Sequence, residues 1–442
     1  MSLQFKIFKQ LIIMSLKNRL IIMNFLQFAV WGAYLTSMSR YLGPAGMGAY
    51  IGIFYSVQGI VSIFMPALIG IIADRWVSAQ KLLGACHLLA AVFMASAGLY
   101  AISSGGNVSF AIFFTLYTLS VAFYMPTLAL SNSVAYTILD RSGLDTVKAF
   151  PPIRVFGTIG FICTMWIVDI LGYQTTPMQF IISAFIGLLL GLYSFTLPNC
   201  PVSTDTNDKT LAQRLGLDAF KLFKQRKMAL FFIFSMLLGV SLQITNGFAN
   251  PFIASFEAAT EYANSFGVKH SNILISLSQI SEALCILLIP FFLSRFGIKK
   301  VILIAMLAWV LRFGLFGLGN PGGGLWLLIM SMLVYGVAFD FFNVSGSLFV
   351  DKETPHNIRS SAQGMFMLMT NGVGATIGTL GAQMVVNRFT SWQDVLVNGE
   401  VKSLMIGDWQ SVWFIFAGYA LIVTILFAIL FKYKHTPDLK KS

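Results

Sequence analysis

The sequence predicts an all-α membrane protein whose twelve transmembrane helices form two six-helix halves. Of its 442 residues, 57% are hydrophobic and only 10% are charged, whereas soluble domains carry about 25% charged residues. Twelve apolar runs are long enough to cross a bilayer as helices, which takes about 20 residues each. The longest polar interruption inside this array, residues 198–227, separates the first six runs from the last six.

The expected spans follow one another with short connections. Those of the first half cover residues 20–40, 48–73, 82–102, 108–136, 149–172 and 178–198. Those of the second half cover residues 228–254, 270–294, 299–319, 325–350, 360–385 and 410–432. We therefore expect an N-terminal bundle at 1–199, a cytoplasmic linker at 200–227 and a C-terminal bundle at 228–442.

The basic residues predict the orientation in the membrane. Most of the 29 lysines and arginines fall in segments that share one side of the membrane with both termini. Because cytoplasmic loops are enriched in Lys and Arg, both termini are expected in the cytoplasm. The excess of basic residues behind the net charge of +12 then lies on the cytoplasmic side, where anionic lipids attract it. This location argues against nucleic acid as a partner. Residues 1–19 are basic and amphipathic and could form an interfacial helix. Alternatively, the true start is Met14 and the first thirteen residues are not part of the protein.

Short sequence matches recur in the same order in the two halves. They pair Arg75 with Arg295, residues 121–123 with 337–339, and residues 153–154 with 358–359. Such internal repetition indicates two halves related by an axis along the membrane normal, with a ligand bound between them near the midplane.

The tenth span carries an acidic side chain, Asp340, near its middle. An acid at this depth costs roughly 2.5–3.5 kcal/mol on insertion scales and usually marks a route for a proton or a substrate. Tyr335, Phe339 and Asn343 follow one another at four-residue intervals and share a helix face. This face could hold a planar polar ring beside a carboxylate. The alternative is a hydrogen-bonded cluster between helices with no ligand.

Two other spans of the second half present polar faces. Gln279 and Glu282 lie three residues apart in span eight, and Gln243 and Asn246 lie three apart in span seven. A single amide is explained by helix–helix contact, but three polar faces with two carboxylates favour a ligand site. A carboxyl group removed from water takes up a proton more readily, so Glu282 and Asp340 are candidate proton carriers.

In the first half, Arg154, Thr158 and Phe161 form one stripe on span five. The prolines at 151 and 152 precede this stripe and are expected to bend or break the helix. The stripe suggests a binding surface. The alternative is that Arg154 extends to the cytoplasmic membrane surface, because it lies only a turn or two inside.

Other polar side chains within apolar runs are weaker candidates. Gln27 and Trp31 share a face of span one, and His87 either shuttles protons or forms a structural hydrogen bond. We expect Asp169 at a solvated helix end and Arg312 at the outer interface of the membrane.

The connection after span two carries a different signal. Gly70, Asp74 and Arg75 combine a small residue with an acid–base pair at a helix end, which could lock a cytoplasmic gate. The alternative for Arg75 is ordinary cytoplasmic positive charge. No Ser/His/Asp arrangement, phosphate-binding glycine loop or metal-ligand cluster is present in the sequence, so we expect no enzymatic activity, no bound metal and no cofactor.

The twelve spans and the Gly70-x-x-x-Asp74-Arg75 connection resemble the major facilitator superfamily. More specifically, residues 150–161, 242–246, 278–282 and 334–343 resemble the bacterial nucleoside–proton symporter family, and the similarity extends from about Met14 to Lys434. The residues that match the family's substrate and coupling positions are Arg154, Thr158, Phe161, Gln243, Asn246, Gln279, Glu282, Tyr335, Phe339 and Asp340.

This resemblance implies a monomeric importer of purine and pyrimidine nucleosides in the bacterial inner membrane, driven by the proton gradient. Its partners would be nucleosides, protons and membrane lipids. It also implies that Arg154 lies deeper in the membrane than the helix boundary suggests. A xanthosine-preferring permease and a proton-coupled transporter of another polar solute such as a sugar stay open as alternatives. The two mid-membrane carboxylates argue against a passive uniporter.

Overall fold

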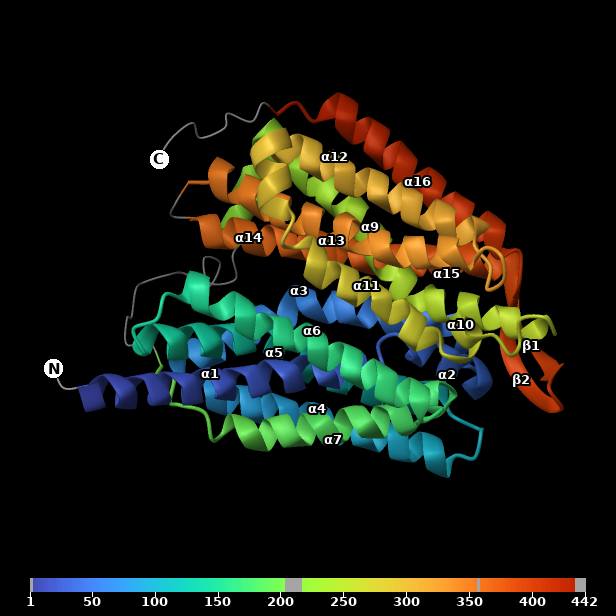
Figure 1. Cartoon of the computed structure of the whole chain (residues 1–442), viewed down its shortest axis with the longest axis horizontal. Coiled ribbons are helices and arrows are strands. Elements are labelled where there is room, and N and C mark those ends of the chain that lie inside the picture. The colour runs from blue at the N-terminus through green and yellow to red at the C-terminus, as the bar shows by residue number, and fades with distance from the viewer. Residues whose placement is uncertain (1–2, 203–216, 356–357, 434–442) are drawn as a thin grey trace. The chain divides into compact units, whose positions relative to one another are not determined.

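The computed structural model describes residues 3–202, 217–355 and 358–433, most of them helical (Figure 1). The chain divides into two compact units. One consists of Met1–Met38 and Phe64–Asp208, and the other of Ser39–Ile63 and Lys209–Ser442. Residues 203–216, half of the predicted linker at 200–227, lie outside the described residues.

In the first unit, α1 packs against α6, and α4 packs against both α5 and α7. The close approach of α1 and α6 depends on glycine. A Cβ at Gly160 would lie 2.2 Å from the carbonyl oxygen of Phe25, and small residues of this kind let helix backbones meet in membranes. The helices of this unit are α1 (Leu3–Gly32), α4 (Ala79–Ser103), α5 (Phe110–Arg141), α6 (Thr146–Ile170) and α7 (Met178–Ser194), joined by the later part of α3 (Ile51–Arg75).

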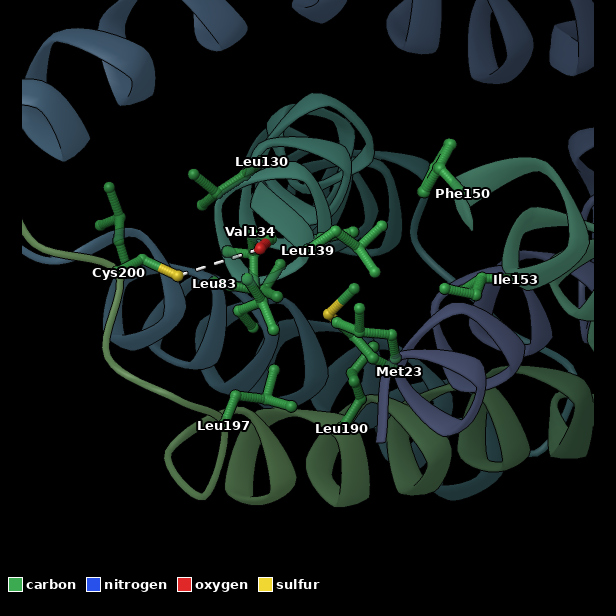
Figure 2. Packing of buried hydrophobic residues seen from close by; sticks show 14 of the residues in the cluster. Met23, Leu83, Leu130, Val134, Leu139, Phe150, Ile153, Leu190, Leu197 and Cys200 are labelled. Atoms are coloured by element: carbon green, nitrogen blue, oxygen red, sulfur yellow. Dashed lines mark hydrogen bonds between the residues drawn. The ribbon is translucent and has the colours of Figure 1, made fainter. Parts of the chain in front are cut away.

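The apolar core of the first unit brings together side chains from α1, α3, α4, α5, α6 and α7 (Figure 2). Met23 of α1, Val134 of α5, Ile153 of α6 and Leu190 of α7 are all buried there. Cys200, which follows α7, lies with its Sγ 3.9 Å from the carbonyl oxygen of Val134. Burial raises the pKa of the Cys200 thiol to about 11. The thiol is therefore protonated at neutral pH and behaves as a small apolar group.

In the second unit, α12 packs against α13 and α16, α11 packs against α13, and α9 packs against η7 and α15 (Figure 1). The first part of α3 also belongs to this unit. Its elements are α2 (Met38–Leu42), η1 (Gly43–Met47), η2 (Gly48–Tyr50), η4 (Leu217–Lys224), α9 (Arg226–Ser255), η5 (Phe256–Ala258), α10 (Phe266–Lys269), α11 (Ser271–Cys285), α12 (Ile289–Leu318), α13 (Leu325–Glu353), α14 (Arg359–Met367), η7 (Leu368–Gly374), α15 (Ala375–Phe389), β1 (Thr390–Val397), β2 (Glu400–Gly407) and α16 (Trp409–Leu430).

Several predicted spans are interrupted. The first span ends as an α-helix at Gly32, and the chain makes a turn before α2 begins at Met38. The eighth span ends at Cys285 and turns before Pro290, which has no N–H to continue a helix. The eleventh span contains the π-helical segment η7 between two α-helices.

The prolines of α6 have less effect than expected. Residues 151 and 152 lie inside α6, which continues unbroken from Thr146 to Ile170. Each proline removes one hydrogen bond near the N-terminal end of the helix, and the rest of α6 is supported by its contact with α1.

Within the described ranges, eight helices are long and apolar enough to cross a membrane. Helix α7 is a shorter apolar helix. The interruptions of the eighth and eleventh spans account for part of the difference from twelve, because α11, α14 and α15 are each too short to count alone. Helix α2 is counted together with most of α3 in the candidate span Met38–Ala73.

The connection between the last two predicted spans folds as an antiparallel hairpin of β1 and β2. Its turn places Asn398 at φ 53° and Gly399 at φ 84°, the positive values that a two-residue type I′ turn requires. The Asn-Gly pair was therefore a readable signal that the helix-based prediction missed. Val397 and Leu404 of the hairpin pack against Ala254 at the end of α9.

A buried cluster of charges holds α2, η5 and the hairpin together in the second unit. The guanidinium of Arg40 forms an ion pair with Glu257, and the side chain of Glu257 is only 4% exposed. The Nζ of Lys402 lies 2.9 Å from the other carboxylate oxygen of Glu257. One carboxylate thus balances two cations that come from distant parts of the chain.

We expect Glu257→Gln to destabilise the protein, because Arg40 would keep its charge in a buried place without a counter-ion. Loss of one partner of a buried pair costs about 3–5 kcal/mol. The thermal unfolding midpoint of the detergent-purified protein should fall by several degrees. Asp394→Asn, on the exposed face of the same hairpin, is the control and should leave the midpoint unchanged. Equal midpoints for the two variants would contradict this account of the cluster.

Candidate functional site

The polar face predicted on α13 is present. The rings of Tyr335 and Phe339 are stacked, with centroids 5.5 Å apart and planes 9° apart. Tyr335 is 6% exposed and Asp340 5% exposed, whereas Phe339 and Asn343 are half-buried. The helix therefore presents a flat aromatic pair next to a buried acid, as its four-residue spacing predicted.

Helices α11 and α13 cross in close contact at Gly336. A Cβ at this position would lie 2.5 Å from the carbonyl oxygen of Ser281, and the Ser281 hydroxyl donates a hydrogen bond to the carbonyl of Leu333. Glu282 directly follows Ser281, and Asp340 lies one turn beyond Gly336. The crossing therefore brings the two predicted carboxylates to neighbouring positions on adjacent helices.

The electrostatic surroundings of Tyr335 support this placement. Its phenol is within the electrostatic range of Glu282, Asp340 and Arg312. Cys285, one turn after Ser281, is likewise within range of Asp340. Two carboxylates, one phenol and one guanidinium thus occupy one region of the second unit.

The amides of the second unit have different surroundings. Asn246 donates from Nδ2 to Oε1 of Gln243 at 2.8 Å, so these two residues of α9 share a face as predicted. Gln279 of α11 is half-buried, and in the described part of the chain no donor reaches its buried Oε1. A buried acceptor without a partner requires an explanation, and a ligand that donates a hydrogen bond would supply one.

In the first unit, the stripe on α6 faces α1. The guanidinium carbon of half-buried Arg154 lies 3.9 Å from the ring centroid of Phe28. Thr158 is half-buried, and Phe161, 7% exposed, meets the ring of Trp31 edge-on at 6.2 Å. The stripe therefore combines a cation stacked on a ring, a hydroxyl group and an aromatic pair.

A hydrogen-bonded network lies beside this stripe. Gln27 donates from Nε2 to Thr127 at 2.8 Å, and its Oε1 lies 2.8 Å from Nε2 of His87. The hydroxyl of Tyr124 donates to the backbone carbonyl of Gln27, and the ring of Tyr124 contacts Trp31. His87 therefore makes the structural hydrogen bond that was one of its two predicted roles, and Tyr124 is a neighbour that the sequence analysis missed.

Two charged residues differ from their predicted positions. Arg312 is 2% exposed rather than at the outer interface, and it contacts Tyr335. Asp169 is 3% exposed rather than solvated. Because a charged side chain inside an apolar span is costly and usually has a function, Arg312 in the span 299–319 could have been identified as a candidate in the same way as Asp340.

The predicted gating residues lie at the end of α3. Arg75, in the last turn of this helix, is exposed, and the side chain of Asp74 lies outside the described part of the structure. A Cβ at Gly70 would meet no atom within 4 Å, so this glycine does not mark a close helix contact here. The role of these residues stays a prediction.

Comparison with known proteins gives consistent matches over nearly the whole chain. Residues 14–436 match the family model described as nucleoside H+ symporter. The chain is 48% identical over 425 residues to nucleoside permease NupG of Escherichia coli strain K12, covering 96% of this chain and 97% of that protein. It is 47% identical over 428 residues to a xanthosine permease of the same organism, covering 96% and 98%.

The fold is also that of solved transporters. The crystal structure of nucleoside transporter NupG matches with a TM-score of 0.84 and 47% identity, over 95% of this chain and all of that one. A D-xylose–proton symporter matches with a TM-score of 0.67 at 14% identity, over 97% and 100%, which shows the fold alone. The predicted twelve-helix major facilitator fold is confirmed.

We expect Gly336→Ala to destabilise the second unit, because the added Cβ would force α11 and α13 apart. Overpacking of this kind costs about 1–3 kcal/mol. Gly314→Ala on α12 is the matched control, since its Cβ would meet no atom within 4 Å and alanine favours a helix by up to about 1 kcal/mol. Thermal unfolding should show a lower midpoint for Gly336→Ala only. A midpoint at or above that of the unmodified protein would mean that the crossing is not tight.

Proposed function

Because the chain belongs to the nucleoside H+ symporter family, we propose that the residues gathered in its two units form the sites for nucleoside and proton. The protein is a proton-coupled nucleoside transporter and not an enzyme. The observation that carries the assignment of the site is the α11–α13 crossing. There a stacked aromatic pair stands beside two carboxylates.

The second unit supplies most of the proposed nucleoside contacts. A nucleobase is planar and apolar on its faces, and Tyr335 with Phe339 offers a parallel aromatic surface for it. Gln279 has a buried acceptor without a partner among the described residues, which suits an amino or hydroxyl donor of the substrate. Gln243 and Asn246 supply further amide groups for the base or the ribose.

Within the first unit, Arg154, Thr158 and Phe161 are further candidates for nucleoside contact. Arg154 is held in its orientation by Phe28 and has N–H groups that can donate to substrate oxygens. Thr158 adds a hydroxyl, and Phe161 adds an aromatic edge supported by Trp31.

Asp340 and Glu282 are the proposed proton carriers. A carboxylate is costly at bilayer depth, and protonation removes that cost. Uptake of a proton on the outer side would therefore accompany substrate binding, and its release on the inner side would restore the charged state. The energy source is the proton gradient, so the mechanism uses no cofactor. Asp74 and Arg75 are proposed to take part in closing the cytoplasmic side.

The proposed membrane location, orientation and direction of transport follow from the distribution of Lys and Arg along the chain and from the family. We place the protein in the bacterial inner membrane as a monomer surrounded by lipid, with both termini in the cytoplasm. Transport is then directed inward, along the proton gradient.

A xanthosine-preferring permease is a second candidate. This chain is almost equally similar to a xanthosine permease and to a general nucleoside permease, at 47% and 48% identity. A preference for another polar solute such as a sugar has no support of this kind, because the likeness to the D-xylose–proton symporter at 14% identity concerns the fold alone.

We expect Asp340→Asn to abolish accumulation of radiolabelled uridine in membrane vesicles that carry a pH gradient. Asparagine keeps the size and polarity of the side chain but cannot take up and release a proton. Asp394→Asn, an exposed residue of the hairpin, should accumulate uridine as the unmodified protein does. Continued concentrative uptake by Asp340→Asn would remove Asp340 from the proton role.

A thermal-shift panel should separate the candidate substrates. Ligands that bind the folded protein raise its free energy of unfolding, by about 2.7 kcal/mol at one hundred times the Kd, and so raise the unfolding midpoint. We expect uridine and inosine to raise the midpoint of the purified protein and xylose to leave it unchanged. A shift with xanthosine alone would identify the narrower permease, and a shift with the sugar alone would contradict nucleoside transport.

A further inference from the structure

Arg312 is a fully buried cation on α12 that the proposed mechanism does not yet use. Its side chain is surrounded by aromatic rings. The guanidinium carbon lies 4.5 Å from the ring centroid of Tyr335, 5.3 Å from that of Phe316 and 6.0 Å from that of Trp309. Cation–π contacts in such a desolvated place are among the stronger ones.

The same guanidinium connects three helices. Its Nη1 donates to the backbone carbonyl of Ser331 on α13 at 2.8 Å and to the hydroxyl of Ser278 on α11 at 3.3 Å. The hydroxyl of Ser331 donates in return to the backbone carbonyl of Arg312 at 2.8 Å. Arg312 thus ties together the two helices that carry Glu282 and Asp340.

The charge of Arg312 is not neutralised by direct contact. Among the described residues, no carboxylate forms an ion pair with it, and its Nε has no hydrogen-bond partner. A buried cation without a counter-ion is costly, and well-packed apolar side chains often stabilise a protein as well or better. Stability alone is therefore a weak reason for an arginine here.

The contacts of Tyr335 point to another reason. Its ring is held by Arg312, by the edge of Trp309 at 5.9 Å and by stacked Phe339. Ser278, which Arg312 also contacts, lies one turn before Glu282 on the same face of α11. Both groups that Arg312 holds are therefore immediate neighbours of the proposed site.

We propose that Arg312 is a positioning residue of the nucleoside site, which holds the ring of Tyr335 and the Ser278–Glu282 face of α11 in the orientation that binds substrate. This role rests on the proposed function. Arg312 does not touch the nucleoside. Lysine at this position would keep the charge but would lose the contact of a planar guanidinium with the Tyr335 ring and the two hydrogen bonds from Nη1, so the substitution tests the geometry rather than the charge.

The test measures uridine uptake in proteoliposomes with an imposed pH gradient, together with the unfolding midpoint of each purified variant. We expect Arg312→Lys to raise the KM about tenfold, with a maximal rate and a midpoint close to those of the unmodified protein. Arg388→Lys, at the exposed end of α15, is the matched control. It should leave the KM, the maximal rate and the unfolding midpoint unchanged. An unchanged KM for Arg312→Lys, with or without a lower midpoint, would overturn the proposal.

A double-mutant cycle with Tyr335→Leu tests whether Arg312 acts through the ring. If it does, the two effects on KM are not additive, and Arg312→Lys changes KM little once the ring is gone. Fully additive effects would reject the route through Tyr335. Failure of the unmodified protein to take up any nucleoside would contradict the proposed function itself. Saturable uptake with an unchanged KM for Arg312→Lys would reject only the role of Arg312.

Discussion

A charge buried away from water is costly, and the placement of the buried charges in this protein follows from that constraint. Arg154 stacks on Phe28, Arg312 lies among three aromatic rings, and Arg40 pairs with Glu257. Each of these cations packs against a partner that offsets part of the cost of its burial. Each cation therefore helps to fix the relative position of the helices that supply its contacts. These polar groups stabilise the packing of the helices and are also candidates for function.

Close helix contact is the second condition for the site. Lipid provides no hydrophobic force between helices, so small residues and hydrogen bonds decide where backbones meet. Gly160 brings α6 to α1 and Gly336 brings α13 to α11. Phe161 directly follows Gly160, and Asp340 lies one turn beyond Gly336. Candidate site residues thus stand next to places where helix backbones pack closely, which limits how far they can move.

The candidate site was predictable where it depends on one helix and was not where it depends on several. The stacking of Tyr335 on Phe339 and the bond from Asn246 to Gln243 follow from helical spacing alone. Hydropathy does not say on which face of its helix Arg312 lies. We expected this residue at the outer interface, so its contact with Tyr335 was missed. Asp169 was misplaced for the same reason, because depth along a helix does not say which way a side chain points.

The sequence by itself determined the membrane class, the approximate spans and the residues that share a face. It could do so because bilayer thickness sets helix length and the helical repeat sets spacing. Only the tertiary structure decided the breaks at Gly32 and before Pro290, the packing of Ser39–Ile63 with the second unit, and the meeting of Arg312 with Tyr335 and Ser278. These features depend on contacts between residues far apart in the chain. A local sequence pattern cannot predict which distant side chain will make such a contact.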